Sequence, residues 1–159
     1  GLSTRRFAFE AFLPTDKKEK MAVLKELVNE TRTIILYEAP HRLTKTLKEL
    51  EEMLGNRRMT LVRELTKKHE TAFCTTISEL IQYYENQGPK GECVLVIEGR
   101  LREDMIKEDR EQWSTLSIEE HMEIYLGKGM DKKEAMKAVS LDRGVPKREI
   151  YKQLLDLEG

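Results

Sequence analysis

The stretch TIILYEAPHR, residues 33–42, decides the fold. Its first half, from Thr33 to Tyr37, is a continuous run of mostly apolar and β-branched residues, which is typical of a strand buried on both faces of a sheet. Pro40 ends the run, and polar residues gather where the strand stops. Apolar strands that alternate with helices indicate a layered α/β domain.

Strands and helices do alternate on either side of this stretch. Phe7, Phe9, Ala11 and Leu13 recur at every second position before Pro14, which predicts a strand with these side chains on one face. Helices are predicted over residues 17–29, 43–54 and 78–86, and further strands over residues 59–62, 70–76 and 93–97. The first 99 residues therefore predict an α/β domain with a mixed sheet.

The composition changes after Gly99. Residues 100–114 are mostly charged and predict either a solvated linker helix or a disordered connection. From residue 115 to the end the pattern is helical, with three short helices over 118–126, 132–140 and 147–157. Ser117 and Asp131 are placed as N-caps, and Pro146 precedes the third helix. Residues 115–159 are thus expected to form a small helix-turn-helix-like domain.

The bulk composition excludes several classes of protein. The formal net charge is −1, so any binding to nucleic acid has to come from local basic patches. No apolar run approaches the roughly 20 residues that span a bilayer. Cys74 and Cys93 are far apart, which favours a reduced, cytoplasmic protein. Three scattered histidines provide no ligand spacing for a metal, and none is expected.

Polar segments stand at the ends of the predicted buried strands. Residues 37–42 follow one strand and residues 63–67 follow another. In an open α/β sheet, ligands bind outside the carboxyl ends of strands, so these two segments are well placed for a site. Residues 90–92 and 98–99 are similar polar turns beside the strand at 93–97. The alternative for each segment is a solvated loop, and residues alone leave both interpretations open.

Four segments, taken in order, resemble one family. FEAFLP at residues 9–14, TRTIILYEAPHRL at 31–43, RELTKKHE at 63–70 and PKGECVLVIEG at 89–99 are similar to the second half of the ribosomal RNA small subunit methyltransferase I family, itself similar to the tetrapyrrole methylases. The resemblance implies a two-lobed fold with S-adenosylmethionine between the lobes. It also implies methylation of the ribose 2′-hydroxyl of a cytidine in 16S rRNA of the small ribosomal subunit, and it allows a homodimer of the full-length enzyme.

The resemblance also implies which residues lie near the cofactor. Carried over by position, they are Tyr37, Glu38, Ala39 and Pro40, then Arg63, Glu64, Leu65, Thr66 and Lys67, and finally Lys90, Gly91 and Glu92. Residues proposed to contact RNA are Arg42, Lys67, Arg143, Lys147, Arg148 and Lys152. Lys67 or Glu64 could help to remove the hydroxyl proton, or could simply hold the loop, so no catalytic base is assigned.

The sequence departs from the family pattern in three respects. Ala39 stands where the family usually has Ser, so a hydroxyl contact is lost, and residues 2–5 differ from the family's Leu-Pro-Thr-Asp. The family's first lobe, with its glycine-rich turn, is expected upstream, because the chain begins Gly1-Leu2 without Met. We therefore expect residues 1–159 alone to bind the methyl donor weakly. Two alternatives remain open: a methylase acting on a tetrapyrrole, and a non-catalytic RNA-binding or regulatory module.

Overall fold

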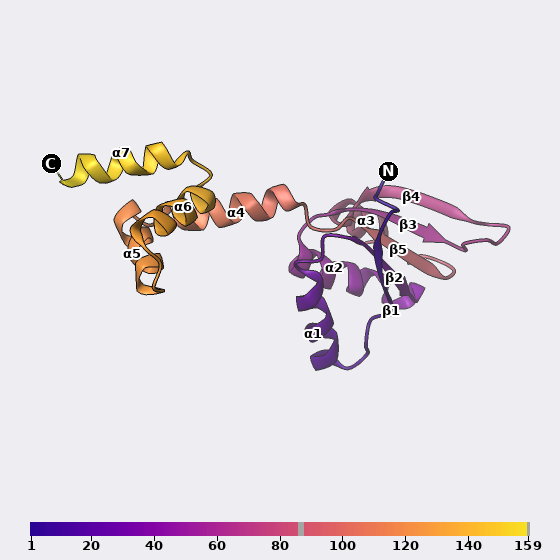
Figure 1. Ribbon diagram of the computed structural model, residues 1–159. Coiled ribbons are helices and arrows are strands. Elements are labelled where there is room, and N and C mark those ends of the chain that lie inside the picture. The colour runs from indigo at the N-terminus through magenta and orange to yellow at the C-terminus, as the bar shows by residue number, and fades with distance from the viewer. Residues whose placement is uncertain (86–87, 159) are drawn as a thin grey trace. The chain divides into compact units, whose positions relative to one another are not determined.

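The computed structural model describes residues 1–85 and 88–158, and these residues form two folded units. Residues 1–101 make up an α/β unit, and residues 102–159 are grouped in a helical unit. Figure 1 shows strands in the first and helices alone in the second. Asn86, at the predicted end of the third helix, lies outside the described residues.

The α/β unit is built on a mixed five-stranded sheet of order β1-β2-β5-β3-β4. The strands are β1 (Phe7–Phe12), β2 (Thr33–Glu38), β3 (Arg58–Arg63), β4 (Thr71–Thr76) and β5 (Cys93–Ile97). β1 and β2 are parallel, and every other neighbouring pair is antiparallel. The carboxyl ends of β1, β2 and β3 therefore share one edge of the sheet with the amino end of β5. The predicted mixed α/β architecture is confirmed.

Three helices pack on the sheet from one side. They are α1 (Lys17–Leu27), α2 (Leu43–Leu54) and α3 (Ile77–Tyr84), and their buried side chains share one core with the strands. Asp16 caps α1 by accepting hydrogen bonds from the backbone N–H groups of Lys18 and Glu19, both at 2.9 Å. Leucines of α1 and α2 pack with Ile34, Leu36 and Leu95 of the central strands in one apolar core. Burial of this apolar surface is what holds the helices to the sheet.

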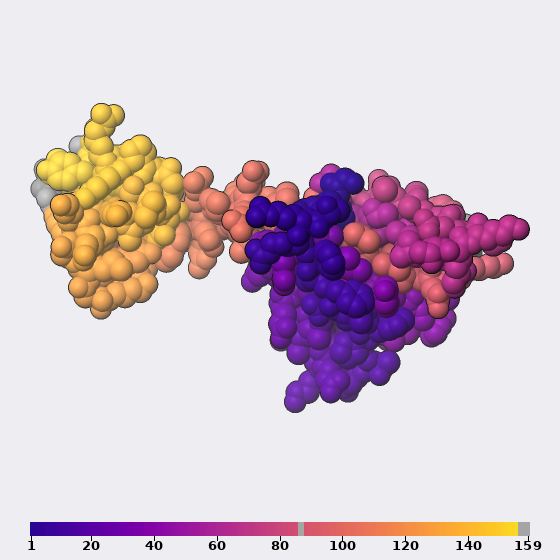
Figure 2. Space-filling view, turned by 45° about the vertical axis from the view of Figure 1, so that its right-hand side comes forward, coloured from indigo at the N-terminus to yellow at the C-terminus, as the bar shows by residue number. Residues whose placement is uncertain are grey.

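The opposite face of the sheet stays open, which corrects two predictions. Ile35 is half-buried and Tyr37 is 40% exposed, so β2 is not buried on both faces within this chain. A bulge between Phe9 and Ala11 shifts the register of β1 against β2. Leu13 is consequently buried in the core, while Phe7 and Phe9 are more than half exposed. Figure 2 shows the indigo N-terminal segment, which contains β1, at the surface.

The helical unit contains α4 (Arg102–Ser114), α5 (Ile118–Gly127), α6 (Lys132–Arg143) and α7 (Lys147–Glu158). Capping boxes begin α5 at Ser117 and α6 at Asp131, so both predicted caps are confirmed. Residues 102–114 are helical, and α4 contacts α6. The sequence predicts three parts, 1–99, 100–114 and 115–159, and the structure groups the chain into two units. The three-part division stays a prediction.

A polar cluster centred on His121 organises the helical unit. The His121 side chain is fully buried, and the Trp113 ring stacks on it with 4.1 Å between centroids. Arg143 donates from Nε to His121 Nδ1 at 3.1 Å, which leaves the hydrogen of the neutral ring on Nε2, where it faces Asp142 Oδ2 at 3.1 Å. Tyr125 also donates to Asp142, and its ring packs against the small core of the unit.

Candidate functional site

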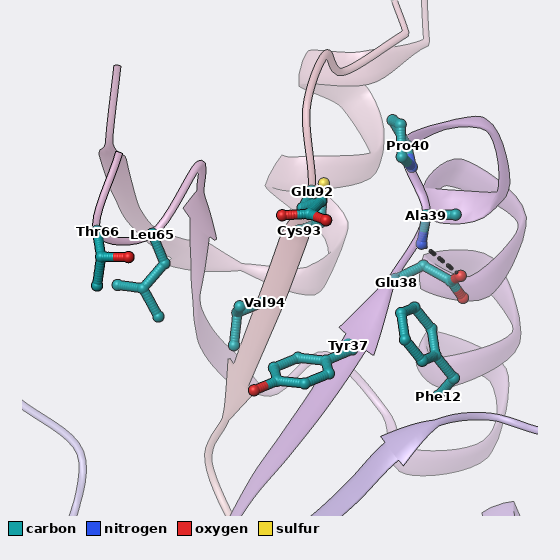
Figure 3. A pocket seen from close by; sticks show the side chains of 10 residues that line it. All are labelled: Phe12, Tyr37, Glu38, Ala39, Pro40, Leu65, Thr66, Glu92, Cys93 and Val94. Carbon is teal, nitrogen blue, oxygen red and sulfur yellow. Dashed lines mark hydrogen bonds between the residues drawn. The ribbon is translucent and has the colours of Figure 1, made fainter. Parts of the chain in front are cut away.

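A hollow of about 590 Å³ opens at the edge of the sheet where the strands β1, β2 and β3 end. Figure 3 shows its walls, which come from the ends of β1 and β2, the loop after β3, and the start of β5. The lining residues are Phe12, Tyr37, Glu38, Ala39, Pro40, Leu65, Thr66, Glu92, Cys93 and Val94. Such a volume suits a small organic ligand, because pockets for these ligands measure roughly 300–1,000 Å³.

One wall of the hollow is aromatic. Tyr37 lies near Phe9 and Phe12 on the neighbouring parallel strand, with ring centroids 5.1 and 5.7 Å apart in edge-to-face geometry. Contacts of this kind hold a ring in place. The Tyr37 ring is 40% exposed and borders the hollow, so it offers a flat surface to a planar ligand.

Glu38 organises the turn that forms the adjacent wall. Its side chain is buried, and its carboxylate accepts hydrogen bonds from the backbone N–H of Ala39 at 2.8 Å and from the Thr46 hydroxyl. Arg42 lies 3.4 Å from the same carboxylate and donates to the carbonyl oxygen of Leu13 at 3.3 Å. A buried carboxylate needs such partners. Glu38 and Arg42 therefore fix the ends of β1 and β2 relative to each other.

The loop after β3 has an unusual backbone. Glu64 and Thr66 adopt φ angles of 50° and 64°, a left-handed region that residues other than Gly seldom occupy. Glu64 keeps this conformation through two hydrogen bonds with Glu92: its N–H donates to the Glu92 carbonyl at 3.1 Å, and its Oε1 accepts from the Glu92 N–H at 2.9 Å. Strained residues of this kind tend to gather at ligand sites.

Charged groups tie this loop to the one before β5. Arg63 Nε donates to the carbonyl oxygen of Lys90 at 2.9 Å. Lys67 Nζ donates to Glu92 Oε2 at 2.8 Å and lies 3.5 Å from Glu64 Oε2. Together these contacts connect residues 63–67 with residues 90–92 and set the width of the hollow between Thr66 and Glu92.

The pKa values of Lys67 and Glu64 argue against either side chain as a general base. The hydrogen bond to Glu92, supported by the nearby Glu64 carboxylate, raises the pKa of Lys67, so the amine stays protonated at neutral pH. The backbone N–H of Glu92, more than Lys67, lowers the pKa of Glu64, so this carboxylate is a weak proton acceptor. Burial raises the pKa of the Cys93 thiol to about 11, which excludes a thiolate nucleophile there.

The structure brings most of the proposed cofactor residues to one place. Tyr37, Glu38, Ala39, Pro40, Leu65, Thr66 and Glu92 line the hollow, whereas Arg63, Glu64, Lys67, Lys90 and Gly91 stand behind its wall. Sequence reasoning missed Phe12, Cys93 and Val94. Phe12 faces the hollow because of the bulge in β1, for which the sequence gives no signal. Val94 lies opposite Tyr37 in the antiparallel pair of β2 and β5, a register that the sequence does not reveal.

Four of the six proposed RNA-binding residues lie in the helical unit, and they fall into two groups, while Arg42 and Lys67 are paired with Glu38 and Glu92 beside the hollow. Arg143 has its guanidinium inside the helical unit, where it donates to the carbonyls of Leu116 at 2.6 Å and Ser117 at 2.9 Å as well as to His121. Lys147 donates to the carbonyl of Lys133 at 3.3 Å. Arg148 and Lys152 are exposed on α7. Arg143 thus serves the packing of the unit, and the exposed cations remain the candidates for phosphate contacts.

The described part of the chain contains neither a candidate metal cluster nor a candidate membrane-spanning helix. Within residues 1–85 and 88–158, no three His, Cys, Asp or Glu side chains come together as a set that could hold a metal ion. None of the helices in those residues is both long and apolar enough to cross a membrane. Neither Cys74, which is exposed, nor the buried Cys93 forms a disulfide.

Comparison with known proteins matches the site to a family. Residues 3–81, which supply β1, β2, β3 and the loop after β3, match the family model of the tetrapyrrole (corrin/porphyrin) methylases. Over these residues, about half of its length, the chain has the sequence pattern of the tetrapyrrole methylases.

Relatives within this family share a single name. The chain is 45% identical to the ribosomal RNA small subunit methyltransferase I of Bacillus subtilis, over 95% of this chain and 51% of that protein. It is 40% identical to the protein of that name in Synechocystis, over 100% of this chain and 56% of the relative. The corresponding Escherichia coli O157:H7 protein is 36% identical, over 100% and 54%. The chain thus spans about half the length of the curated relatives it matches.

Proposed function

We propose that this chain forms one wall of the methyl-donor site, together with an RNA-binding appendage, of an S-adenosylmethionine-dependent methyltransferase that modifies a ribose 2′-hydroxyl of a cytidine in 16S rRNA. One observation carries the proposal. Residues from the family-like motifs, far apart in the sequence, meet around one hollow at the ligand-binding edge of the sheet. The relatives' shared name supplies the class of substrate.

The walls of the hollow suit the chemical parts of S-adenosylmethionine. The exposed Tyr37 face suits a planar adenine, and the apolar side chains of Leu65 and Val94 suit the sides of the ring. The Thr66 hydroxyl and backbone groups near Ala39 can meet polar edges of the base and the ribose. The Glu92 carboxylate, which is largely exposed beside Lys67, can face a cationic group. The donor supplies an electrophilic methyl group on a sulfonium.

The chain's own residues contribute binding and orientation. Glu38 and Arg42 hold the turn at residues 39–42, and Glu64 with Arg63 holds the two loops on the other side of the hollow. Neither Lys67 nor Glu64 is a suitable base. We therefore propose that the residues of this wall accelerate methyl transfer by aligning the ribose 2′-hydroxyl with the methyl group of the donor. Alignment alone can supply a large part of a barrier reduction.

The substrate and location are part of the same proposal. The hollow would receive the methyl donor beside a 16S rRNA nucleotide in the small ribosomal subunit, while exposed cations of α7 would contact phosphates of the same RNA. Bacterial rRNA is cytoplasmic, and the two free cysteines are compatible with a reducing compartment. A homodimer of the full-length enzyme belongs to the proposal as well.

The test uses the full-length reading frame that encodes this chain. Small ribosomal subunits lacking 2′-O-methylcytidine are incubated with labelled S-adenosylmethionine, and the modified nucleotide is mapped by mass spectrometry. Tyr37→Ala should weaken donor binding by roughly tenfold or more, because one stacking surface is lost. Tyr83→Ala is the matched control, since Tyr83 is also an exposed tyrosine but lies on α3 outside the hollow.

Alternative activities give different results in the same experiment. Methyl transfer to a tetrapyrrole with none to the ribosomal subunit would favour the other branch of the family. RNA binding with no methyl transfer to any substrate would favour a non-catalytic module. Either result would contradict the proposal.

A further inference from the structure

The outer surface of α7 carries an exposed aromatic residue between two cations. Arg148, Tyr151, Lys152 and Leu155 are spaced by one and two helical turns, so their side chains lie on one face of the helix. All four are exposed, with Tyr151 at 52%, and with Glu149 they line a shallow hollow of about 470 Å³. Figure 2 shows the yellow atoms of α7 at the surface of the helical unit.

The opposite face of α7 anchors it. Ile150 is fully buried in the small core and Leu154 packs against that core. Gly144, with a φ of 66°, ends α6, and the N–H of Val145 donates to the carbonyl of Ser140 at 3.1 Å. Lys147 is tied to Lys133. The exposed stripe of residues therefore stands on a fixed helix, and the backbone that carries it needs little further ordering to bind a ligand.

Charge is divided unevenly within the helical unit. Residues 102–127, which include α4 and α5, contain eight acidic and three basic residues, whereas residues 128–158, which include α6 and α7, contain eight basic and six acidic residues. The whole unit has no basic excess, so its composition hides this division. A phosphate backbone is attracted to the α6–α7 side and repelled from the α4–α5 side.

From this stripe and this charge division we propose that the outer face of α7 binds single-stranded RNA, with the Tyr151 ring stacked on an unpaired base and with Arg148 and Lys152 on the flanking phosphates. The partner's chemistry follows from the residues. Stacking on an aromatic ring needs a base that is free of its duplex, and cations beside the ring suit the phosphates on either side. The inference rests on the proposed function, which supplies RNA as the substrate.

Binding is tested with the chain of residues 1–159 and a fluorescein-labelled oligocytidine, alone or paired with its complement, by anisotropy at several salt concentrations. Tyr151→Ala should weaken binding to the single strand by roughly tenfold, in the range for one lost stack, and Tyr151→Phe should preserve it. Replacing Arg148 and Lys152 with Gln together should reduce the salt slope by about 1.4, at about 0.7 per phosphate contact. Lys107→Gln, on the acidic α4, should change neither quantity.

Two results would overturn the inference: equal or tighter binding of the duplex, or single-strand affinity that is unchanged by Tyr151→Ala. The second would leave α7 as a docking face for something other than RNA. Circular dichroism of each variant checks that the helices persist. Failure here is distinct from failure of the proposed function. If Tyr151→Ala binds normally while the full-length enzyme methylates ribosomal subunits, only this inference is lost.

Discussion

The carboxylate of Glu64 occupies the space into which a side chain on Gly91 would point. Gly91 has a φ of 83°, and the Oε1 atom of Glu64 continues past it to the N–H of Glu92. Two loops separated by 27 positions in the sequence are thereby closed against each other behind the candidate donor site. The absence of a side chain at residue 91 is what lets them meet.

Gly91→Ala should destabilise the α/β unit by about 1–3 kcal/mol, because the new methyl group clashes with Glu64 and the positive φ is unfavourable. Glu64→Gly in the same chain should recover part of this loss, since it removes the clash. Urea unfolding of the single and double variants measures the coupling. Gly55→Ala is the control: Gly55 has a φ of 79° but open space around it, so it should show no coupling to Glu64→Gly. Equal coupling for both glycines would contradict the steric explanation.

The helical unit should lose stability as the pH falls below about 6.5. Burial, partly opposed by Asp142, lowers the pKa of His121 below its value in the unfolded chain, which is about 6.5. The unfolded state therefore binds more protons in this range, and the stabilisation is complete above that pH. Protonation would also turn Nδ1 into a donor facing the Arg143 donor, while Lys128 adds a second positive charge.

Thermal melting between pH 5 and pH 8 checks this prediction. His121→Gln cannot titrate, so its melting temperature should be lower at pH 8 but should change less between pH 8 and pH 5. A wild-type profile that is flat over this range would show that His121 does not control the unit.

Asp131→Ala should destabilise the helical unit by about 1 kcal/mol. The Asp131 carboxylate accepts from the backbone N–H of Glu134 at 2.7 Å, and Glu134 reciprocates at the N–H of Asp131 at 3.2 Å. Loss of such a cap typically costs this much, whereas Asn serves as well as Asp. Asp131→Asn should therefore stay within a few tenths of a kcal/mol of the wild type in chemical denaturation. Equal losses in both variants would point to the charge of Asp131 and away from its cap.

Trypsin should cut the native chain first after Arg102. The two folded units meet in the sequence at residues 101 and 102, and this position lies at the start of α4. Arg110, farther along the same helix, borders Gly144 at the end of α6 and should be protected. Mass spectrometry of the earliest fragments should give residues 1–102 and 103–159. Initial cleavage after Arg110 would mean that α4 does not stay packed on α6.

Local sequence signals were enough to locate most of the elements. Caps at Asp16, Ser117 and Asp131 and the glycine at residue 55 all act on backbone groups within a few residues, so their effect can be deduced from sequence. The strand at 93–97 was predicted with its observed limits. The bulge in β1 was not, because it depends on how Phe9 and Ala11 pair with β2, and an alternating pattern contains no information on register.

The sequence predicts where the candidate site lies, but it does not predict how the side chains are arranged around the hollow. Motifs at strand ends identified seven residues that do line the hollow. Thr66 borders the hollow, whereas Glu64 does not line it. This difference depends on the left-handed backbone of the turn that contains both residues. That turn is held by hydrogen bonds to Glu92, a partner 28 residues away, and such long-range pairing has no local signature.

Trp113 gives the helical unit an optical signal of its own. It is the single tryptophan of the chain, and its ring stacks on the imidazole of His121. Fluorescence excited at the red edge of the indole absorption band therefore comes from this unit alone, because the tyrosines of the α/β unit do not absorb there. Since a protonated imidazole accepts an electron from an excited indole more readily than a neutral one, the brightness of this emission should record both the undocking of α4 and the charge on the buried ring.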